Sequence, residues 1–405
     1  MACSLELTRT ALIALVLASV GACVAPPPGP REPATWGDCD FPDLHLRADF
    51  PAARANACRR PDRDHLEVMI EPEGRPINPS PWYAFRVDAA RRRTITLTLH
   101  YSGYKYRYPP KLSSDGTHWR NLPESDLQVA DDQLSASVRL KVTSSPLWVA
   151  AQELFTNSDY DEWTSKLLTH APFAAKTLLG KSREGRDIWL LNSSPDEEKP
   201  RTLVIVGRQH PPEVTGAFAL TAFVEQLLAD TPQARNFREG HRLLIVPNLN
   251  PDGVAHGNWR HNAGGIDLNR DWGPFTQPET RLMRDLIAST VADRRTRLQL
   301  VLDFHSTYRD LMYTQYDEEP VEPPMFAAHW IARIRERLPA YALEREPNNS
   351  GVPSARTYVS RKYGISSITY EVGDNTERAR IARVSQEAAF ALMDAMSAGD
   401  RLENR

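Results

Sequence analysis

Two patterns of hydrophobic and polar residues divide the chain. Between Leu66 and Leu154, short runs rich in β-branched and aromatic residues are separated by turn residues such as Ser113-Ser114-Asp115-Gly116. Runs of this kind between turn signals are typical of an all-β domain. The pattern predicts a small β-sandwich that includes strands at 82–87, 94–101, 135–142 and 147–151.

From residue 156 onward, apolar runs alternate with amphipathic stretches. The predicted strands are 203–206, 243–246, 298–304 and 365–372, and the predicted helices are 217–229, 278–293, 326–338 and 377–396. Strand–helix alternation indicates a parallel or mixed sheet covered on both faces. The predicted fold class is therefore α/β. A mixed-sheet α/β/α domain at 156–400 follows a small all-β sandwich domain at 41–155.

Polar side chains come at the ends of three of these strands. His210 closely follows the first, Asn248 follows the second, and His305 ends the third. In open α/β sheets, ligands bind outside the carboxyl ends of the strands. We therefore expect these side chains to converge on one rim of the sheet.

Length and composition narrow the classes of function. The 405 residues allow two or three domains, and 41% hydrophobic content is enough for a real core. The formal net charge is −3, which argues against nucleic acid as a partner.

The first residues are typical of an export signal. The apolar run 11–22 is too short to span a membrane, and Val20-Gly21-Ala22-Cys23 is similar to a lipobox. The sequence predicts a signal peptide at 1–22, lipidation of Cys23, and a proline-rich tether at 23–40. An ordinary signal peptide cleaved nearby is the alternative. Because Val24 follows the cysteine, we expect an exported, periplasmic outer-membrane lipoprotein that contacts the membrane only through its anchor.

Two cysteines remain beyond the anchor. In an oxidising compartment, Cys39 and Cys58 favour a disulfide over two free thiols. Closing this loop would contribute on the order of 3 kcal/mol to stability in the chain-entropy interpretation.

A zinc site is indicated by three residues. His210-x-x-Glu213 places a nitrogen and an oxygen ligand between a strand end and a helix start, and His305 adds a second imidazole. Each alone has an ordinary explanation, since a glutamate at a helix start favours the helix dipole. Together they form the His₂Glu set of catalytic zinc sites, which leaves one coordination position open. We expect one zinc ion here.

Two carboxylates near this set also carry predictions. Metal-bound histidines commonly donate their second N–H to a carboxylate, and Asp267 is the candidate for orienting His210. Its alternative role is to cap the turn beside Gly264-Gly265. Glu371 ends an apolar strand, where a carboxylate is costly unless it is paired or functional.

These residues belong to a larger set of short motifs. The stretch 176–396 resembles the zinc carboxypeptidase superfamily, with the carboxypeptidase A-like fold. The matching motifs are His210-x-x-Glu213, Asn250-Pro251-Asp252-Gly253, Asn258-Trp259-Arg260, Asp267-Leu268-Asn269-Arg270-Asp271-Trp272, His305-Ser306 and Glu371. The resemblance is greatest to the cytosolic-carboxypeptidase subfamily, which carries an N-terminal β-sandwich. The export signal conflicts with a cytosolic location, so only the architecture is carried over.

The resemblance implies a role for each matching residue. His210, Glu213 and His305 would bind zinc. Glu371 would take the proton of the attacking water and later pass it to the leaving amine.

It also implies how a peptide is held. Asn269 and Arg270 would dock the terminal carboxylate, which suits the planar guanidinium fork. Arg260 would polarise the scissile carbonyl and stabilise the oxyanion. Either arginine could instead be an exposed loop residue.

The segment before Glu371 bears on substrate choice. Arg356 falls near a basic position that resembles the acidic-residue pocket of deglutamylating members. This implies a preference for acidic or other carboxylate-bearing terminal residues. The tyrosine that often closes over substrate has no clear counterpart, and Tyr358 and Tyr363 are the candidates.

The resulting hypothesis is a zinc metallocarboxypeptidase that hydrolyses a C-terminal peptide or isopeptide bond. Its expected substrates are ordinary peptides or cell-wall peptides carrying diaminopimelate or glutamate. One alternative is a zinc amidohydrolase or deacylase of acylated amino acids. Another is a catalytically silent cell-envelope binding protein, against which the presence of Glu371 argues.

Overall fold

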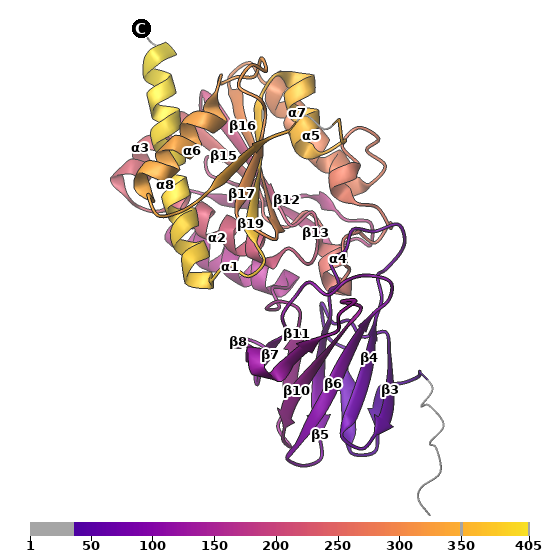
Figure 1. Ribbon diagram of the computed structural model, residues 1–405. Coiled ribbons are helices and arrows are strands. Elements are labelled where there is room, and N and C mark those ends of the chain that lie inside the picture. The colour runs from indigo at the N-terminus through magenta and orange to yellow at the C-terminus, as the bar shows by residue number, and fades with distance from the viewer. Residues whose placement is uncertain (1–35, 349–350, 404–405) are drawn as a thin grey trace, which may run out of the picture. The chain divides into compact units, whose positions relative to one another are not determined.

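Two facing β-sheets form the first part of the chain in the computed structural model, which describes residues 36–348 and 351–403. Their elements are β1 (Asp40–Phe41), β2 (Leu44–Arg47), β3 (Ala57–Asp62), β4 (His65–Ile70), β5 (Ala84–Ala89), β6 (Arg93–Tyr101), β7 (Lys111–Ser113), β8 (Trp119–Asn121), η1 (Glu124–Asp126), β9 (Leu127–Val129), β10 (Ser135–Val142) and β11 (Leu147–Ala150). One sheet has the order β1-β2-β5-β11-β7-β8 and the other β3-β4-β6-β10-β9. Most of these strands are labelled in Figure 1. The pairs are antiparallel except β4 with β6.

The sandwich core follows from alternation along the strands. In β10, Ala136, Val138, Leu140 and Val142 are buried while the residues between them are more exposed. This period of two places every second side chain between the sheets, as expected for an antiparallel sheet with one solvated face. The predicted β-sandwich is confirmed.

A disulfide joins Cys39, just before β1, to Cys58 in β3. The predicted signal peptide at 1–22, the lipidation of Cys23 and most of the tether at 23–40 lie outside the described residues, and these remain predictions. Within the described part of the chain, no helix combines the length and apolar character that a membrane crossing requires.

The second part of the chain is a mixed α/β structure. Its strands are β12 (Ala175–Lys181), β13 (Asp187–Asn192), β14 (Arg201–Gly207), β15 (His241–Val246), β16 (Arg297–Thr307), β17 (Leu311–Thr314), β18 (Glu344–Pro347) and β19 (Ser366–Gly373). Its helices are α1 (Asn157–His170), α2 (Val214–Leu228), α3 (Pro232–Gly240), α4 (Pro251–His256), η2 (Leu268–Arg270), α5 (Pro278–Ala292), α6 (Phe326–Arg337), α7 (Ala355–Tyr363) and α8 (Arg378–Glu403).

The eight strands form one sheet in the order β12-β13-β15-β14-β16-β19-β17-β18. Its centre is parallel, because β14 pairs in parallel with β15 and β16, and β16 pairs in parallel with β19. The flanks include antiparallel pairs, such as β13 with β15 and β17 with β19. The predicted mixed sheet is confirmed.

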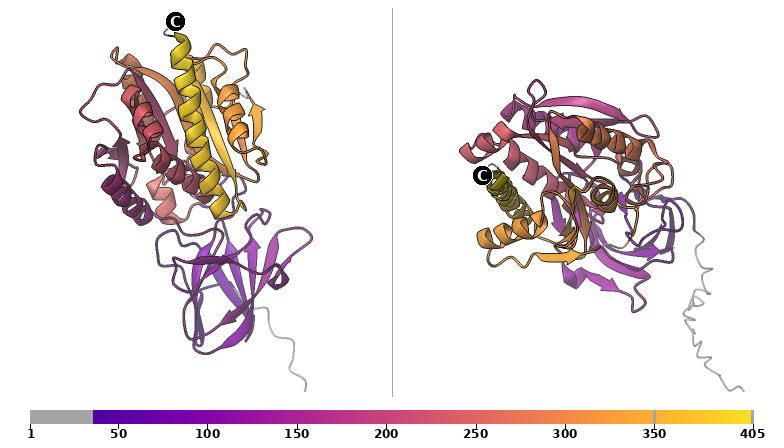
Figure 2. Two further views of the ribbon diagram at one scale, coloured as in Figure 1. Left: turned by 90° about the vertical axis from the view of Figure 1, so that its left-hand side faces the viewer. Right: turned by 90° about the horizontal axis from the view of Figure 1, so that it is seen from above.

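Helices cover both faces of this sheet (Figures 1 and 2). Along β14, Leu203 and Ile205 pack into a core with helices α2, α3, α6 and α8, whereas Val204 and Val206 pack with α5 and α7. Both sides of the central strands are therefore apolar. This explains why they appear in the sequence as continuous hydrophobic runs.

The sandwich and the α/β part pack into one compact unit, Thr35–Arg405. Trp259, which follows α4, is fully buried in the sandwich core. The segment that follows α4 is thus held against the sandwich.

Candidate active site

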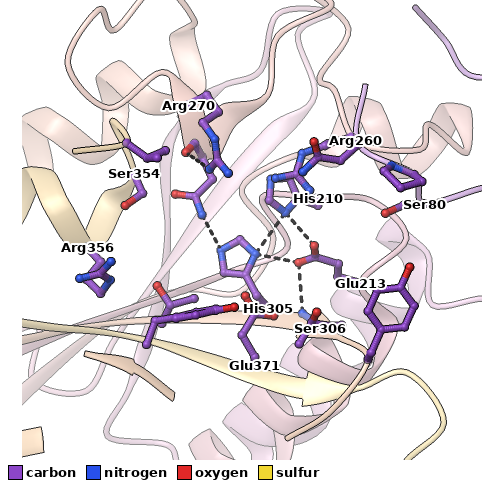
Figure 3. Close-up of a pocket in the computed structure, with 18 of the residues that line it drawn as sticks. Ser80, His210, Glu213, Arg260, Arg270, His305, Ser306, Ser354, Arg356 and Glu371 are labelled. Carbon is purple, nitrogen blue, oxygen red and sulfur yellow. Dashed lines mark hydrogen bonds and ion pairs between the residues drawn. The ribbon is translucent and has the colours of Figure 1, made fainter. Parts of the chain in front are cut away.

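A cavity of about 440 Å³ opens over the carboxyl ends of the central strands (Figure 3). Its lining includes the sequence-predicted residues His210, Glu213, Arg260, Asn269, Arg270, His305, Arg356 and Glu371. These residues come from chain segments far apart in the sequence. The structure therefore brings them to one place on the rim of the sheet.

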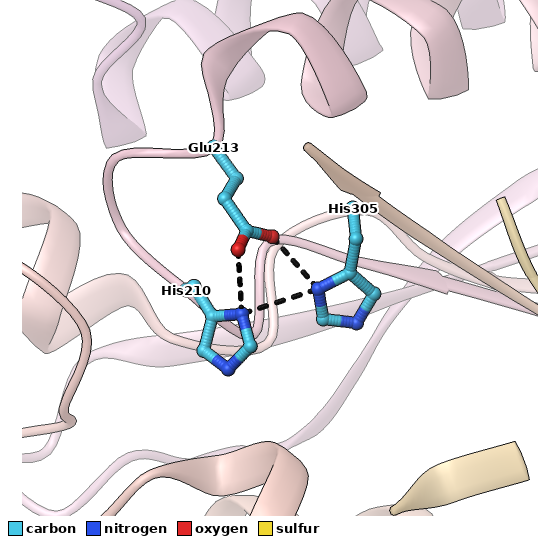
Figure 4. A group of neighbouring side chains, drawn as sticks. All are labelled: His210, Glu213 and His305. Atoms are coloured by element: carbon cyan, nitrogen blue, oxygen red, sulfur yellow. Dashed lines mark hydrogen bonds and ion pairs between the residues drawn. The ribbon is translucent and has the colours of Figure 1, made fainter. Parts of the chain in front are cut away.

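Three of them point their donor atoms at a common centre (Figure 4). Nδ1 of His210 lies 2.8 Å from Oε1 of Glu213, and Nδ1 of His305 lies 2.7 Å from Oε2 of the same carboxylate. The two Nδ1 atoms are 3.1 Å apart. All three residues are buried.

Local backbone geometry places these ligands. β14 ends at Gly207, and Arg208 takes a positive φ of 55° before the chain turns toward His210. Glu213 is then the N-cap residue of α2. One strand-to-helix turn thus carries two of the ligands.

The third ligand, His305, lies near the end of the neighbouring strand β16, and Gly216 of α2 packs against its backbone. A Cβ atom at position 216 would stand 2.5 Å from the carbonyl oxygen of His305, closer than real Cβ contacts. Glycine is therefore required for α2 to approach β16 this closely.

A carboxylate holds the outer nitrogen of each imidazole. Nε2 of His210 is 2.9 Å from Oδ1 of Asp267, and Nε2 of His305 is 2.8 Å from Oδ2 of Asp303. In the metal-loaded site the proton of each ring would remain on Nε2, held by its carboxylate, and each Nδ1 would offer its lone pair to the metal. Asp303 carried no sequence-based prediction, although its position two residues before His305 on a strand places both side chains on one face.

Asp267 contacts both His210 and the backbone of η2. The oxygen that meets His210 also accepts a hydrogen bond from the backbone N–H of Asn269 at 2.9 Å. The other oxygen accepts from Nε of Arg260 at 2.6 Å. One carboxylate therefore caps η2 and links an imidazole to an arginine.

The donor set has the chemistry of a zinc site. Two imidazole nitrogens and one carboxylate oxygen converge, both rings are held from outside, and one side faces the cavity. Burial by itself would raise the pKa of Glu213, but the neighbouring His210 and His305 outweigh it and hold that pKa well below its ordinary value. The carboxylate is therefore ionised and ready to meet a cation.

Glu371 lies beside these ligands. In the parallel pairing of β16 with β19, His305 is the direct partner of Glu371. Its buried Oε2 has no hydrogen-bond partner among the residues that the structure describes. Burial raises the pKa of Glu371 to about 8. A carboxylate with one buried oxygen that lacks a partner is a candidate for a chemical role.

Asn269 has a fixed orientation at the edge of the cavity. Its Oδ1 accepts a hydrogen bond from the backbone N–H of Ala355 at 3.0 Å, so its amide nitrogen faces His305 at 3.3 Å. Because Nε2 of His305 donates to Asp303, this amide N–H remains available to another acceptor.

The two arginines of the predicted docking region differ in exposure. Arg260 is buried, and its single bond to Asp267 through Nε leaves both terminal nitrogens for the cavity. Arg270 is exposed and donates to the carbonyl oxygen of Asn269 at 2.8 Å. Both line the cavity, so neither is only a surface residue.

Arg356 also lines the cavity, from the first turn of α7. It is 6% exposed, and its Nη1 donates to the carbonyl oxygen of Thr314 at 3.2 Å. Among the described residues, no carboxylate lies within ion-pair distance of its guanidinium. Burial lowers the pKa of Arg356, because little negative charge lies nearby to offset the cost of burying its guanidinium cation.

Three residues named from the sequence lie outside the cavity. Asn248 does not join the cavity, because its side chain donates to Oδ1 of Asn157 at 2.8 Å. Tyr358 packs against Phe275 with ring centroids 4.9 Å apart, and Tyr363 packs against Tyr358. Hydrophobic packing holds both tyrosines away from the cavity. The tyrosines that line it are instead Tyr308 and Tyr313.

The sandwich supplies further lining residues that the sequence analysis did not identify. Ser80 and Arg107 both border the cavity. Arg107 donates to Oδ2 of Asp374 at 2.8 Å and to Oγ of Ser80 at 2.9 Å. These positions carry no recognisable motif, and only the packing of the sandwich against the α/β part brings them here.

Fold and site together define a class, that of metal-dependent hydrolases with one His₂Glu centre at the rim of a mixed α/β sheet. A family model described as zinc carboxypeptidase matches residues 160–392, more than half of the chain. The protein belongs to the zinc carboxypeptidase family.

Curated relatives share part of the chain. "Cytosolic carboxypeptidase 6" of Mus musculus is 35% identical over 136 residues, covering 32% of this chain and 25% of the relative. "Cytosolic carboxypeptidase 2" of Danio rerio is 30% identical over 262 residues, covering 56% of this chain and 36% of the relative. The matches thus span only a quarter to about a third of these relatives.

Solved structures share the whole architecture. A metallo-carboxypeptidase from Burkholderia cenocepacia has a TM-score of 0.75 at 20% identity, covering 88% of this chain and 99% of that one. A metallo-carboxypeptidase from Pseudomonas aeruginosa has a TM-score of 0.71 at 23% identity, covering 87% and 99%. At these identities the likeness establishes the fold.

Proposed function

We propose that this protein is a zinc carboxypeptidase that hydrolyses the peptide or isopeptide bond next to a free terminal carboxylate. The observation that carries the proposal is the arrangement of His210, Glu213 and His305 around one centre, with Glu371 beside it, whose Oε2 has no hydrogen-bond partner among the described residues. Membership of the zinc carboxypeptidase family supports the same assignment.

A zinc ion held by these three ligands supplies Lewis-acid chemistry, lowering the pKa of water to about 7 and polarising a carbonyl group. Glu371 accepts the proton of the attacking water and then delivers it to the leaving amine. Burial of this side chain raises its pKa, which makes the carboxylate a better base for accepting the proton of water. The protonated form can then donate that proton to the leaving amine.

Arg260 stabilises the negative charge that develops on the carbonyl oxygen. Asp267 holds Nε of this arginine, which directs the free terminal nitrogens at the cavity without committing them. A preorganised donor of this kind contributes about 3–4 kcal/mol to lowering the barrier.

The substrate's terminal carboxylate docks on Asn269 and Arg270. The amide orientation of Asn269 is set by Ala355, and the exposed Arg270 meets an incoming carboxylate from the solvent side. An amide N–H and a guanidinium fork together match the geometry of a planar anion.

The preferred substrates carry a carboxylate on the side chain of their terminal residue. Arg356 supports this, because its buried guanidinium lines the cavity and no carboxylate of the described residues lies within ion-pair distance of it. A buried charge of this kind is costly until an anion meets it. Glutamate, aspartate and diaminopimelate termini all present such an anion, and cell-wall peptides are one source of them.

The experiment is a substrate profile of the purified, zinc-loaded protein. The library contains short peptides that differ in the final residue, each with a free terminal carboxylate and, for comparison, with a terminal amide. It also contains acylated amino acids. We expect hydrolysis of free-carboxylate peptides, fastest for acidic final residues, and none of the amides. Faster hydrolysis of acylated amino acids would indicate a deacylase, and no hydrolysis of any compound would refute enzymatic function.

A further inference from the structure

A carboxylate of the sandwich binds the segment that carries Arg260. Glu73 lies in the loop between β4 and β5. Its Oε2 accepts a hydrogen bond from the backbone N–H of Trp259 at 2.7 Å. Its Oε1 accepts from the N–H groups of Arg260 at 3.0 Å and His261 at 2.7 Å.

Three consecutive main-chain donors on one side chain make a specific contact. The side chain of Glu73 is only 10% exposed, so these bonds form largely away from bulk water. Charge-assisted hydrogen bonds are roughly twice as strong as neutral ones, and consecutive backbone N–H groups form a concave anion site. The bonds therefore determine where the backbone of this segment lies.

The segment has little other regular structure to hold it. It follows the end of α4 at His256 and precedes η2 at Leu268, with no strand ladder between them. The side chain of Arg260 is held separately, by Asp267 through Nε. Glu73 and Asp267 thus hold the backbone and the side chain of the same arginine.

Neighbouring contacts attach the segment to the sandwich on both sides of Glu73. Nη1 of Arg54 donates to the carbonyl oxygen of Gly257 at 3.0 Å. The indole N–H of Trp259 donates to the carbonyl oxygen of Trp82 at 3.1 Å, and its ring is fully buried. These contacts place the segment, and the backbone N–H of Arg260 itself donates to Glu73.

We propose that Glu73 is a positioning residue for the reaction, through which the sandwich holds Arg260 at the site of the developing oxyanion. The inference rests on the role of Arg260 in the proposed function. Because an arginine displaced by about 1 Å loses much of its effect on a transition state, Glu73 should act on turnover more than on substrate binding.

The test is a double-mutant cycle on the full chain, with wild type, E73Q, R260A and E73Q/R260A all loaded with zinc. Two quantities are measured: kcat and KM on the best peptide of the library, and the Kd of a phosphonate peptide, a tetrahedral analogue of the transition state. E71Q is the matched control, because Glu71 is an exposed acid on the same loop. Zinc content and melting temperature are recorded for every variant.

We expect E73Q to lower kcat and weaken phosphonate binding by about 10- to 100-fold, with zinc content and KM close to wild type. In the R260A background the same change should alter phosphonate binding by no more than about twofold. E71Q should behave as wild type. If E73Q does not yield folded protein, E73D is carried through the same cycle, since it keeps the charge but moves the oxygens.

Two results would overturn the inference. One is an unchanged kcat and phosphonate Kd in E73Q. The other is an equal loss with and without Arg260, which would make Glu73 a general support of the fold. A wild-type protein that hydrolyses no peptide would instead refute the proposed function, and the cycle on phosphonate binding would still decide whether Glu73 and Arg260 are coupled.

Discussion

Glu371 and His305 are direct partners in the parallel pairing of β19 with β16. Their side chains therefore project from the same face of the sheet, and a candidate base stands beside a candidate metal ligand. Both strands are buried and parallel, so this relationship does not depend on a mobile loop.

Replacing Glu371 with glutamine tests its role as base. E371Q keeps the shape of a side chain whose Oε2 has no partner, so the fold should tolerate it. We expect kcat to fall by about 10²- to 10⁴-fold while zinc content stays at the wild-type level. E344Q, which alters an exposed glutamate on β18, is the control. Unchanged turnover in E371Q would eliminate Glu371 as the base.

Asp303 gives the second prediction. It fixes Nε2 of His305, and removal of such an outer carboxylate typically weakens metal binding by about 10- to 100-fold. D303N should therefore raise the zinc Kd by that factor, measured by competition with a chelator. D187N, which alters a half-exposed ion pair with Lys181, is the control. Equal zinc affinity in D303N and D187N would argue against this role.

Zinc affinity should rise with pH. Burial by itself would lower the pKa of His305, but the carboxylates of Asp303 and Glu213 outweigh it and raise that pKa well above its ordinary value. Burial also raises the pKa of Glu371 to about 8. Below these pKa values the metal-free site holds protons that the cation must displace, so lower pH opposes binding.

Between about pH 6 and pH 8, affinity should increase roughly tenfold per pH unit for each proton displaced. Calorimetry in two buffers of different ionisation enthalpy would count the protons released. An affinity independent of pH over this range would contradict the prediction.

Gly216 gives a prediction about structure. In G216A the new Cβ would meet the carbonyl of His305 at 2.5 Å, so α2 must move away from β16. Overpacking of this kind costs about 1–3 kcal/mol of the free energy of unfolding, and here it also displaces Glu213 from His305. We expect a lower melting temperature and weaker zinc binding. In G240A the nearest atom lies 3.6 Å away, so this control should keep both properties.

Arg356 gives the prediction on specificity. R356A should lower kcat/KM about 10- to 100-fold for peptides with an acidic final residue and change it little for apolar ones, since a charged hydrogen bond contributes about 1.5–3 kcal/mol. R356K keeps the positive charge but loses the planar guanidinium that can donate two parallel hydrogen bonds. It should therefore retain part of the preference for acidic final residues. An equal loss on all peptides would exclude a role in recognising the terminal side chain.

Much of the fold was predictable because periodicity is a local property. The strand predicted at 135–142 coincides with β10, and the helix predicted at 278–293 ends one residue beyond α5. Short or half-exposed elements were missed. β1 has two residues, and β12 has no buried residue, so neither carries a clear apolar pattern.

The candidate site, too, could be predicted from the sequence only in part. Short motifs were enough to single out His210, Glu213, His305 and Glu371. Each zinc-ligand candidate alone has an ordinary explanation, but together they form a His₂Glu set near a carboxylate that ends an apolar strand. Their convergence on one cavity, and the second carboxylate at Asp303, became visible only when β14, β16 and β19 were aligned.

Contacts between the two parts of the chain depended wholly on the folded structure. Glu73 meets the backbone N–H of Arg260 across 187 residues, and Arg107 meets Asp374 across 267. A glutamate or arginine in a loop carries no local sign of such a partner. The alternation of apolar and polar side chains, and the types of reactive residue, can be recognised in short stretches of sequence. Contacts between distant residues arise from the packing of the folded chain, so only the tertiary structure decided them in this protein.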